Sequence, residues 1–308
     1  MSLFGADPQA LQQQIERLEQ KLDHVARRQE EILAWLGARL NRVLESQNAY
    51  LGDHTALTFL ETGQRIYVDT RDVGIGSHLL TFGRWETNYT SVFRRLIRPG
   101  QTVFDLGANH GVYTLLGAAA TGPGGQVHAF EANPRLAKLT ELSAAINGYG
   151  GFVSVHHLAV GEAEGVARLV FDHGWSGGGS LFRGDVQEGG ANEGVACRVA
   201  ALDALFPDPG FQVHVLKMDI EGAEGRALAG MPRLLERSRD IRLMLEFAPE
   251  MLAASGVPAP QVAEFLAARG FRAWSIGADS ALTPVEWAML AATERGVQNI
   301  LVSRDEPF

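Results

Sequence analysis

The sequence contains a single cysteine, Cys197, among its 308 residues. One cysteine excludes an intramolecular disulfide framework and a thiolate cluster for structural zinc, so we expect a reducing compartment. No run reaches the roughly 18 consecutive apolar residues that a membrane helix needs. The N-terminus also lacks the basic segment and apolar core of a signal peptide. We therefore expect a cytoplasmic protein without a membrane span.

Positive charge is also scarce, because 27 Lys and Arg residues stand against 36 Asp and Glu residues, for a net charge of -9. Sequence-independent binding to nucleic acids depends on clustered Lys and Arg against phosphates, so we expect no nucleic-acid partner. A small molecule or a neutral polymer suits this balance better. With 46% hydrophobic residues, the chain can bury one sizeable core and carry a modest appendage.

A heptad repeat occupies the N-terminal part of the chain, where apolar residues recur at alternating spacings of four and three from Leu11 to Val43. The seam positions between them hold Ile15, Leu18, Leu22, Val25, Gln29, Ile32, Leu36 and Arg39. Because such a polar helix gains most of its stability by packing its apolar stripe, we expect residues 1–47 to form a coiled-coil helix that makes the chain a homo-oligomer. Val25 and Ile32 at d positions leave a dimer and a trimer open, and folding back on the chain's own globular domain is the alternative.

The rest of the chain predicts an α/β fold. Residues 48–100 suggest a lead-in, with a short hairpin around 65–69 and an amphipathic helix at 87–97. In residues 101–308, strand and helix patterns alternate, which predicts a parallel sheet covered by helices. Seven strands are expected, at 102–106, 126–131, 152–158, 213–219, 241–247, 271–276 and 299–303, with helices at 112–120, 134–147, 223–237 and 260–269. A Gly-rich segment within about 166–200 predicts an inserted antiparallel hairpin or flap.

A tight turn follows the first strand of this series. Asp105 lies at the strand end, and Gly107 and Gly111 let the backbone bend before a helix whose N-terminus faces the turn. A dinucleotide fingerprint would need glycines where this chain has Asn109 and Val112, so a diphosphate ligand such as NAD is disfavoured. S-adenosylmethionine lacks a diphosphate, and its cationic groups suit Asp105 near the methionine portion. A simple helix-capping turn is the alternative.

Glu131 ends the next strand, about two dozen residues after the turn. An acid at this position can bind both hydroxyls of a ribose with its two oxygens. The alternative is that Glu131 caps the following helix, although Asn133 is equally placed to do so. We therefore expect Glu131 and Asn133 to belong to the cofactor site.

A third group of acids gathers where the strand at 213–219 ends, with Asp219 and Glu221, and Glu246 ends a neighbouring strand. Crowded carboxylates can have a pKa raised toward neutrality, which suits a base, and their oxygens are the ligands that Mg²⁺ prefers. The alternative is that Lys217 simply neutralises one of these acids. We expect Glu224 to begin a solvated helix.

Together these motifs resemble the FkbM-type methyltransferase family, whose members methylate hydroxyl groups with S-adenosylmethionine. The likeness covers about residues 83–304 and is carried by 105–114, 130–134, 158–161, 202–203, 217–224, 245–246 and 299–302. It implies the class I methyltransferase fold, a Rossmann-like, mostly parallel sheet of seven strands. Trp85 and Glu86 are similar to the family's segment that closes over the cofactor.

The resemblance also implies roles for single residues. Asp105 and Gly107 would face the methionine end of the cofactor, Asn109 and Gly111 would form the turn, and Glu131 would hold the ribose. Two positions depart from the family. His110 replaces a commonly apolar residue, and Phe247 and Ala248 follow Glu246 where a histidine often stands. The second departure shifts the expected removal of the acceptor's proton, or its orientation by a metal, toward Asp219 and Glu221.

Trp175 in the Gly-rich segment and His173 beside it are candidates for contact with the methyl acceptor, although Trp175 could merely pack within the hairpin. The sequence thus predicts an S-adenosylmethionine-dependent O-methyltransferase that acts on a hydroxyl of a small molecule or glycan. Two other functions stay open. One is a coiled-coil interaction protein with a non-catalytic cofactor-binding domain, and the other is an NAD-dependent oxidoreductase.

Overall fold

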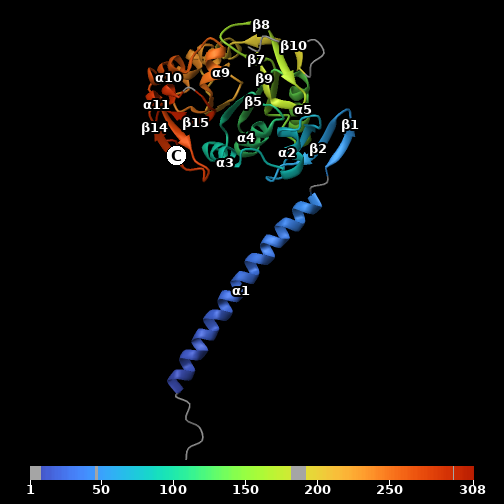
Figure 1. Ribbon diagram of the computed structural model, residues 1–308, viewed down its shortest axis with the longest axis vertical. Helices are drawn as coiled ribbons and strands as arrows, with labels where there is room; N and C mark the ends of the chain where they lie inside the picture. The colour runs from blue at the N-terminus through green and yellow to red at the C-terminus, as the bar shows by residue number, and fades with distance from the viewer. Residues whose placement is uncertain (1–7, 46–47, 182–191, 294) are drawn as a thin grey trace, which may run out of the picture. The chain divides into compact units, whose positions relative to one another are not determined.

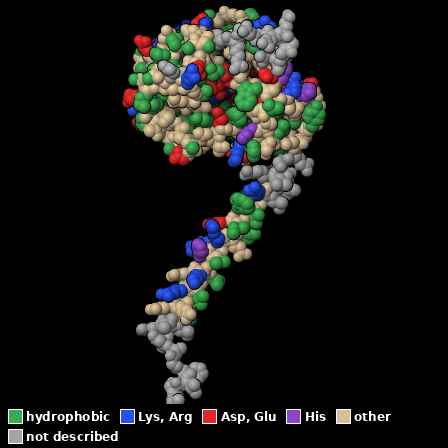
Figure 2. Space-filling model, in the orientation of Figure 1, with side chains coloured by type: hydrophobic (Ala, Val, Ile, Leu, Met, Phe, Trp, Pro, Cys, Tyr) green, Lys and Arg blue, Asp and Glu red, His purple; other side chains and the backbone are tan. Residues whose placement is uncertain are grey.

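The computed structural model describes residues 8–45, 48–181, 192–293 and 295–308, and the chain divides into two units, Met1–Gln47 and Asn48–Phe308 (Figure 1). The first unit contains one long helix, α1 (Pro8–Glu45). Its side chains are exposed from residue 12 to residue 39, including the apolar seam, with Leu22 at 73%. Figure 2 shows hydrophobic side chains along one edge of α1 and Lys and Arg along the other. The expected helix is present, while its self-association stays a prediction.

The second unit begins with a three-stranded antiparallel sheet made of β1 (Ala49–Gly52), β2 (Thr55–Phe59) and β3 (Arg65–Asp69). Two helices follow, α2 (Ile75–Phe82) and α3 (Thr87–Leu96). The hairpin expected around 65–69 is therefore extended by β1, and α2 is an addition to the prediction. No helix in the described part of the chain combines the length and the apolar character that a bilayer crossing needs.

The main sheet has eight strands in the order β14-β13-β15-β12-β11-β4-β5-β6. Their bounds are β4 (Thr102–Leu106), β5 (Gln126–Glu131), β6 (Val153–His157), β11 (Val215–Met218), β12 (Arg242–Phe247), β13 (Arg272–Ile276), β14 (Leu282–Val285) and β15 (Gln298–Ser303). The five strands from β12 to β6 run parallel, while β15 pairs antiparallel with both β12 and β13. This confirms the predicted seven-stranded, mostly parallel sheet of the class I methyltransferase fold, with β14 added at one edge.

The chain order creates a switch point in the middle of this sheet. From β4 the chain continues to β5 and β6 on one side and later returns to β11 and β12 on the other. Ligands of open α/β sheets bind at the carboxyl ends of the strands beside such a point. The site is therefore expected where β4, β5 and β11 end.

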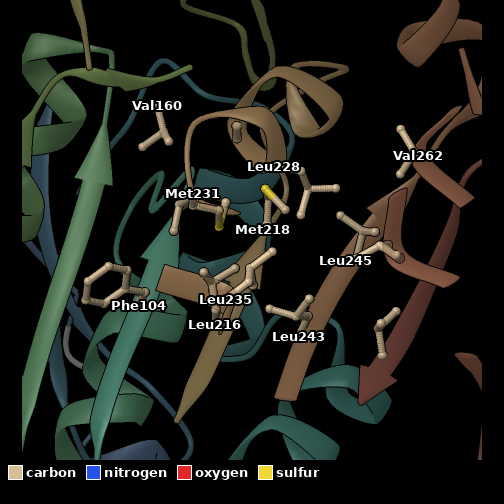
Figure 3. Close-up of a cluster of buried hydrophobic side chains, with 14 of the residues drawn as sticks. Phe104, Val160, Leu216, Met218, Leu228, Met231, Leu235, Leu243, Leu245 and Val262 are labelled. Atoms are coloured by element: carbon tan, nitrogen blue, oxygen red, sulfur yellow. The ribbon is translucent and has the colours of Figure 1, made fainter. Parts of the chain in front are cut away.

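Helices cover both faces of the sheet. Phe104, Leu216 and Leu243 lie on one face, where Figure 3 shows Leu228, Met231 and Leu235 packed over the strands. That face is covered by α7 (Glu224–Ala229), α8 (Pro232–Arg237) and α10 (Ala259–Ala267). The neighbours Val103 and Val215 point to the opposite face, which α3 and α4 (Val112–Thr121) cover. Successive strand residues thus alternate between two buried layers, as a sheet covered on both faces requires.

One helix prediction was wrong, because residues 223–237 form α7 and α8 instead of a single helix. Gly230 ends α7, and Pro232 has no backbone N–H to continue a helix and starts α8 at its first turn. The other helices of this unit are α5 (Pro134–Ile146), α6 (Leu202–Leu205), α9 (Pro249–Ala254) and α11 (Trp287–Ala292).

The expected insertion forms a second, four-stranded sheet in the order β7-β10-β8-β9. Its strands are β7 (Ala159–Val160), β8 (Gly165–Asp172), β9 (Trp175–Ser180) and β10 (Asn192–Ala200). β8 pairs antiparallel with both β9 and β10. The Gly-rich segment is therefore itself a strand, β9, and the hairpin of β8 and β9 is part of a small sheet.

Candidate active site

A pocket lies at the carboxyl ends of β4, β5 and β11, at the switch point of the sheet. It is lined by six of the predicted site residues, namely Gly107, Asn109, Glu131, Asn133, Asp219 and Glu221. The other six, Glu86, Asp105, Gly111, His173, Trp175 and Glu246, do not line it. One ligand in this pocket would contact the turn after β4 together with acids from the ends of β5 and β11.

Gly107 has a left-handed φ of 77°, and its N–H donates to the carbonyl of Phe130. A Cβ atom at this position would lie 1.9 Å from the backbone oxygen of Asp219. The ends of β4 and β11 therefore approach so closely that only glycine fits between them. Gly111 meets a similar limit, because a Cβ there would lie 2.8 Å from the Thr140 side chain. Gly111 thus shapes the turn behind the pocket wall.

Glu131 is 8% exposed, and backbone N–H groups fix both of its oxygens. The N–H of Asn109 donates to Oε2 at 2.7 Å, and the N–H of Asn133 donates to Oε1 at 2.8 Å. Burial raises the pKa of the Glu131 carboxyl, and these two hydrogen bonds oppose that rise. Each oxygen keeps a second lone pair, so the carboxylate is oriented and can still accept from a ligand.

Asn133 performs the capping role that the sequence left open between two residues. Its Oδ1 accepts from the N–H groups of Arg135 and Leu136 at the start of α5. Because this cap satisfies the free N–H groups of the first helical turn, Glu131 is released for the pocket.

Asp105 is fully buried and lies behind the pocket wall. Its Oδ2 accepts from Thr114 Oγ1 at 2.6 Å, and its Oδ1 is 3.8 Å from Lys217 Nζ, with no hydrogen-bond partner among the described residues. Burial raises the pKa of the Asp105 carboxyl, and Lys217 opposes this. Asp105 was predicted to face the methionine end of the cofactor. It is instead linked to the pocket through Lys217, which lines it.

Lys217 lines the pocket and pairs with the acids around it, as the alternative interpretation of the sequence proposed. Its Nζ donates to the carbonyl of Gly107 at 2.9 Å and lies 3.5 Å from Asp219 Oδ2. Burial lowers the pKa of the ammonium, but the carboxylates of Asp219, Asp105 and Glu86 outweigh burial and raise it overall. Lys217 is thus a permanent cation that links the turn after β4 to Asp219. In the sequence, the spacing of two residues between Lys217 and Asp219 indicates that both side chains lie on the same face of the strand.

Glu86 lies beside the main pocket in a small cavity that Asp219 and Lys217 also line. Its carboxylate accepts from the Tyr113 hydroxyl at 2.7 Å and from Asn299 Nδ2 at 3.3 Å. Burial raises its pKa, and these hydrogen bonds oppose the rise. Its neighbour Trp85 lines the main pocket instead.

The metal prediction for Asp219, Glu221 and Glu246 receives no support. Within the described ranges, no three His, Cys, Asp or Glu side chains are grouped in a way that could hold a metal ion. Burial, together with the nearby carboxylates, raises the pKa of Glu246 to about 10.

The prediction for Glu224 was wrong, because this side chain is fully buried rather than solvated. Its Oε1 accepts from the N–H of Ile220 at 2.9 Å, and burial raises its pKa to about 7. The turn between β11 and α7 directs the Glu224 carboxyl into the interior. There it accepts a hydrogen bond from the backbone of the loop that contains Glu221.

The hairpin of β8 and β9 contributes to the pocket through residues other than the two predicted ones. Ser176, Gly177 and Gly179 line it, together with the apolar side chains of Leu169 and Phe171. The Trp175 and His173 side chains lie outside this lining, and Trp175 is 53% exposed. Their contact with an acceptor stays a prediction.

The sequence of the chain matches a known protein family. A family model described as the methyltransferase FkbM domain matches residues 105–273, more than half of the chain. The 31-O-demethyl-FK506 methyltransferase FkbM of Streptomyces tacrolimicus is 29% identical over 161 residues. The match covers 44% of this chain and 61% of that relative.

Solved structures of methyltransferases are also similar at low identity. A SAM-dependent O-methyltransferase of Thermotoga maritima is 11% identical, with a TM-score of 0.38 and coverage of 84% of this chain and 86% of the other. An O-methyltransferase of Bacillus cereus in complex with SAH is 13% identical, with a TM-score of 0.39 and coverage of 71% and 80%.

Proposed function

The chain belongs to the FkbM methyltransferase domain family, and from this premise we propose that it binds S-adenosylmethionine and methylates a hydroxyl oxygen of a small molecule or glycan. Bound S-adenosylmethionine would supply an electrophilic methyl group on a sulfonium. The tasks left to the chain are to bind and orient the two reactants, to exclude water and to take up the acceptor's proton.

Glu131 carries the proposal. Its two oxygens are fixed by backbone N–H groups at the end of β5 and face a pocket that Gly107 and Asp219 also line. A fixed carboxylate with free lone pairs suits the two hydroxyls of a ribose. Asn109, with its side chain where a dinucleotide site needs glycine, favours a nucleoside without a diphosphate over NAD.

Asp219 and Glu221 are the residues that we assign to removal of the acceptor's proton. Both line the pocket, and Asp219 Oδ2 lies 3.5 Å from the Lys217 ammonium, which restrains its position. A carboxylate held in this way can accept a proton from a hydroxyl that approaches within hydrogen-bonding distance. Trp85 and the β8–β9 hairpin supply apolar walls that reduce access of water.

Transfer of a labelled methyl group tests the proposed reaction. The purified protein is incubated with methyl-labelled S-adenosylmethionine and fractions of a cell extract, and labelled products are then treated with mild alkali. A methyl ether formed on a hydroxyl survives this treatment, whereas a methyl ester on a carboxylate is hydrolysed. Label in an alkali-stable, oxygen-linked product is expected. Label that is lost as methanol, or that is attached to nitrogen, would contradict methylation of a hydroxyl.

We also propose that α1 joins copies of this chain. Its seam follows a heptad spacing over residues 11–43, and its apolar side chains are exposed, with Leu18 at 56% and Val25 at 61%. Helices with this repeat bury their seams by supercoiling around one another, and Gln29 at one a position favours alignment with its counterpart.

We further propose a cytoplasmic location, because the single cysteine, Cys197, is free and can form no intramolecular disulfide.

A further inference from the structure

Three segments that are distant in the sequence meet beside the turn after β4. They are the segment 69–76, which runs from the end of β3 through a loop into the start of α2, the 172–177 end of the β8–β9 hairpin, and the turn residues Asn109 and His110. Ser176 Oγ lies at the centre of this contact. It donates to Asp72 Oδ2 and is also 3.1 Å from Asn109 Oδ1. One hydroxyl of the hairpin therefore touches both other segments.

Asp72 organises the loop from within. It is 2% exposed, and its Oδ1 accepts from the N–H of Gly74 at 2.9 Å while its Oδ2 accepts from the N–H of Gly76 at 3.1 Å. The same Oδ2 accepts the hydrogen bond from Ser176 Oγ. A buried carboxylate that shapes its own loop thus also holds the hairpin, and loss of any donor would leave part of a buried charge unpaired.

His110 fixes Asn109 from the other side. Its Nε2 accepts from the N–H of Asp69 at 3.2 Å, so its Nδ1 carries the proton and donates to Asn109 Oδ1 at 2.6 Å. The ring is fully buried, and burial lowers its pKa to about 4, which keeps it neutral. The residue that departs from the family pattern therefore ties β3 to the turn.

Packing and a backbone hydrogen bond support the same contact. The N–H of Val73 donates to the carbonyl of Gly174 at 3.0 Å. The Trp175 ring lies against the loop at Gly74, where an added Cβ atom would be 2.5 Å from two ring atoms. Trp175 thus secures the hairpin to the loop, which accounts for its absence from the pocket lining.

The contact leads directly to Glu131, because the N–H of Asn109 is one of the two donors that fix its carboxylate. We propose that Ser176 and Asp72 are positioning residues that couple docking of the hairpin to the geometry of Glu131, and thereby to affinity for the cofactor. Asn109 has a left-handed φ of 52°, a conformation that costs free energy and is held here by its side-chain partners. Where affinity for the cofactor is concerned, this inference rests on the proposed function.

Two pairs of variants test the coupling in the full-length protein. Ser176→Ala removes the hydroxyl, and Ser154→Ala makes the same change at an exposed position of β6. Gly74→Ala places a methyl group against the Trp175 ring, whereas Gly165→Ala on β8 meets open space. Ser176→Thr restores a hydroxyl. Binding of S-adenosylhomocysteine is measured by calorimetry, and amide hydrogen exchange is measured without ligand.

Ser176→Ala is expected to weaken binding about five- to tenfold, the usual net effect of one hydrogen bond, and Ser176→Thr is expected to recover most of it. Gly74→Ala should weaken binding similarly, and both control variants should bind as the wild type does. In Ser176→Ala the amide of Asn109 should also exchange faster, although this residue is 67 positions away in the sequence.

Wild-type affinity together with unchanged exchange at Asn109 in Ser176→Ala would overturn the coupling. If the wild type itself fails to bind S-adenosylhomocysteine, the proposed function is wrong, and the exchange of Asn109 alone decides whether the hairpin positions the turn. Should Ser176→Ala fail to fold, Gly74→Ala compared with Gly165→Ala decides the question by both measurements.

Discussion

Replacing Glu131 with glutamine changes one atom of the side chain and removes its charge. In the wild type, Oε2 accepts from the N–H of Asn109 at 2.7 Å and Oε1 accepts from the N–H of Asn133 at 2.8 Å. Glutamine has one oxygen, so in either orientation its NH₂ group faces a backbone N–H that it cannot satisfy. A lost hydrogen bond to a charged group costs about 1.5–3 kcal/mol.

For the ligand, the same change removes the charged acceptor that the ribose hydroxyls require. A loss of about 2–3 kcal/mol in binding corresponds to a Kd for S-adenosylhomocysteine that is about 30- to 150-fold higher. Titration calorimetry at neutral pH measures this change, and circular dichroism verifies that the variant is folded. Glu141→Gln on α5 is the matched control, because Glu141 is exposed and pairs only with Lys138 among the described residues. A folded Glu131→Gln protein that binds within threefold of the wild type would refute the assigned role of Glu131.

Three further changes have distinct outcomes. Asp219→Ala should leave the Kd for S-adenosylhomocysteine within a few-fold of wild type and lower label transfer to the identified acceptor by about 10²- to 10⁴-fold, and full turnover would contradict its role as a base. Glu224 has its pKa raised from 4.5 to about 7 by burial, so the stability of the wild type falls as pH rises through this window. The glutamine in the variant Glu224→Gln does not titrate. The unfolding free energy of Glu224→Gln minus that of the wild type, measured by urea denaturation, should therefore rise by about 3 kcal/mol from about pH 5 to about pH 8. A difference that is independent of pH would refute the raised pKa of Glu224. Removal of residues 1–47 should give a folded protein of smaller assembled mass by light scattering, and an unchanged number of copies would exclude α1 as the oligomerisation element.

Strands at the centre of the sheet could be predicted from the sequence with accurate bounds. β4 and β5 were expected at 102–106 and 126–131 and occupy these residues, because each is a short apolar run between turn residues. β14 was missed, since it is a short edge strand that contains Pro284 and pairs only with β13 among the described strands. Edge strands carry little apolar signal because one side of them remains solvated.

Some residues of the candidate site could also be predicted from the sequence, and others could not. Glu131 and Asp219 could be located because the carboxyl ends of parallel strands meet at one edge, so a position at a strand end is already a position in space. The contact between Asp72 and Ser176 could not be predicted, because it joins residues 104 positions apart, one in the loop after β3 and the other in the edge strand β9. Glu224 was misjudged for a similar reason, since the direction of its side chain depends on how the loop after β11 turns.

Equilibrium binding of S-adenosylmethionine and of NAD to the wild-type protein tests the central claim most directly. The account predicts saturable binding of S-adenosylmethionine with one molecule per chain and no binding of NAD in the same buffer. Binding of NAD alone, or no heat from S-adenosylmethionine at millimolar concentration with folded protein, would contradict a methyl-donor site built around Glu131.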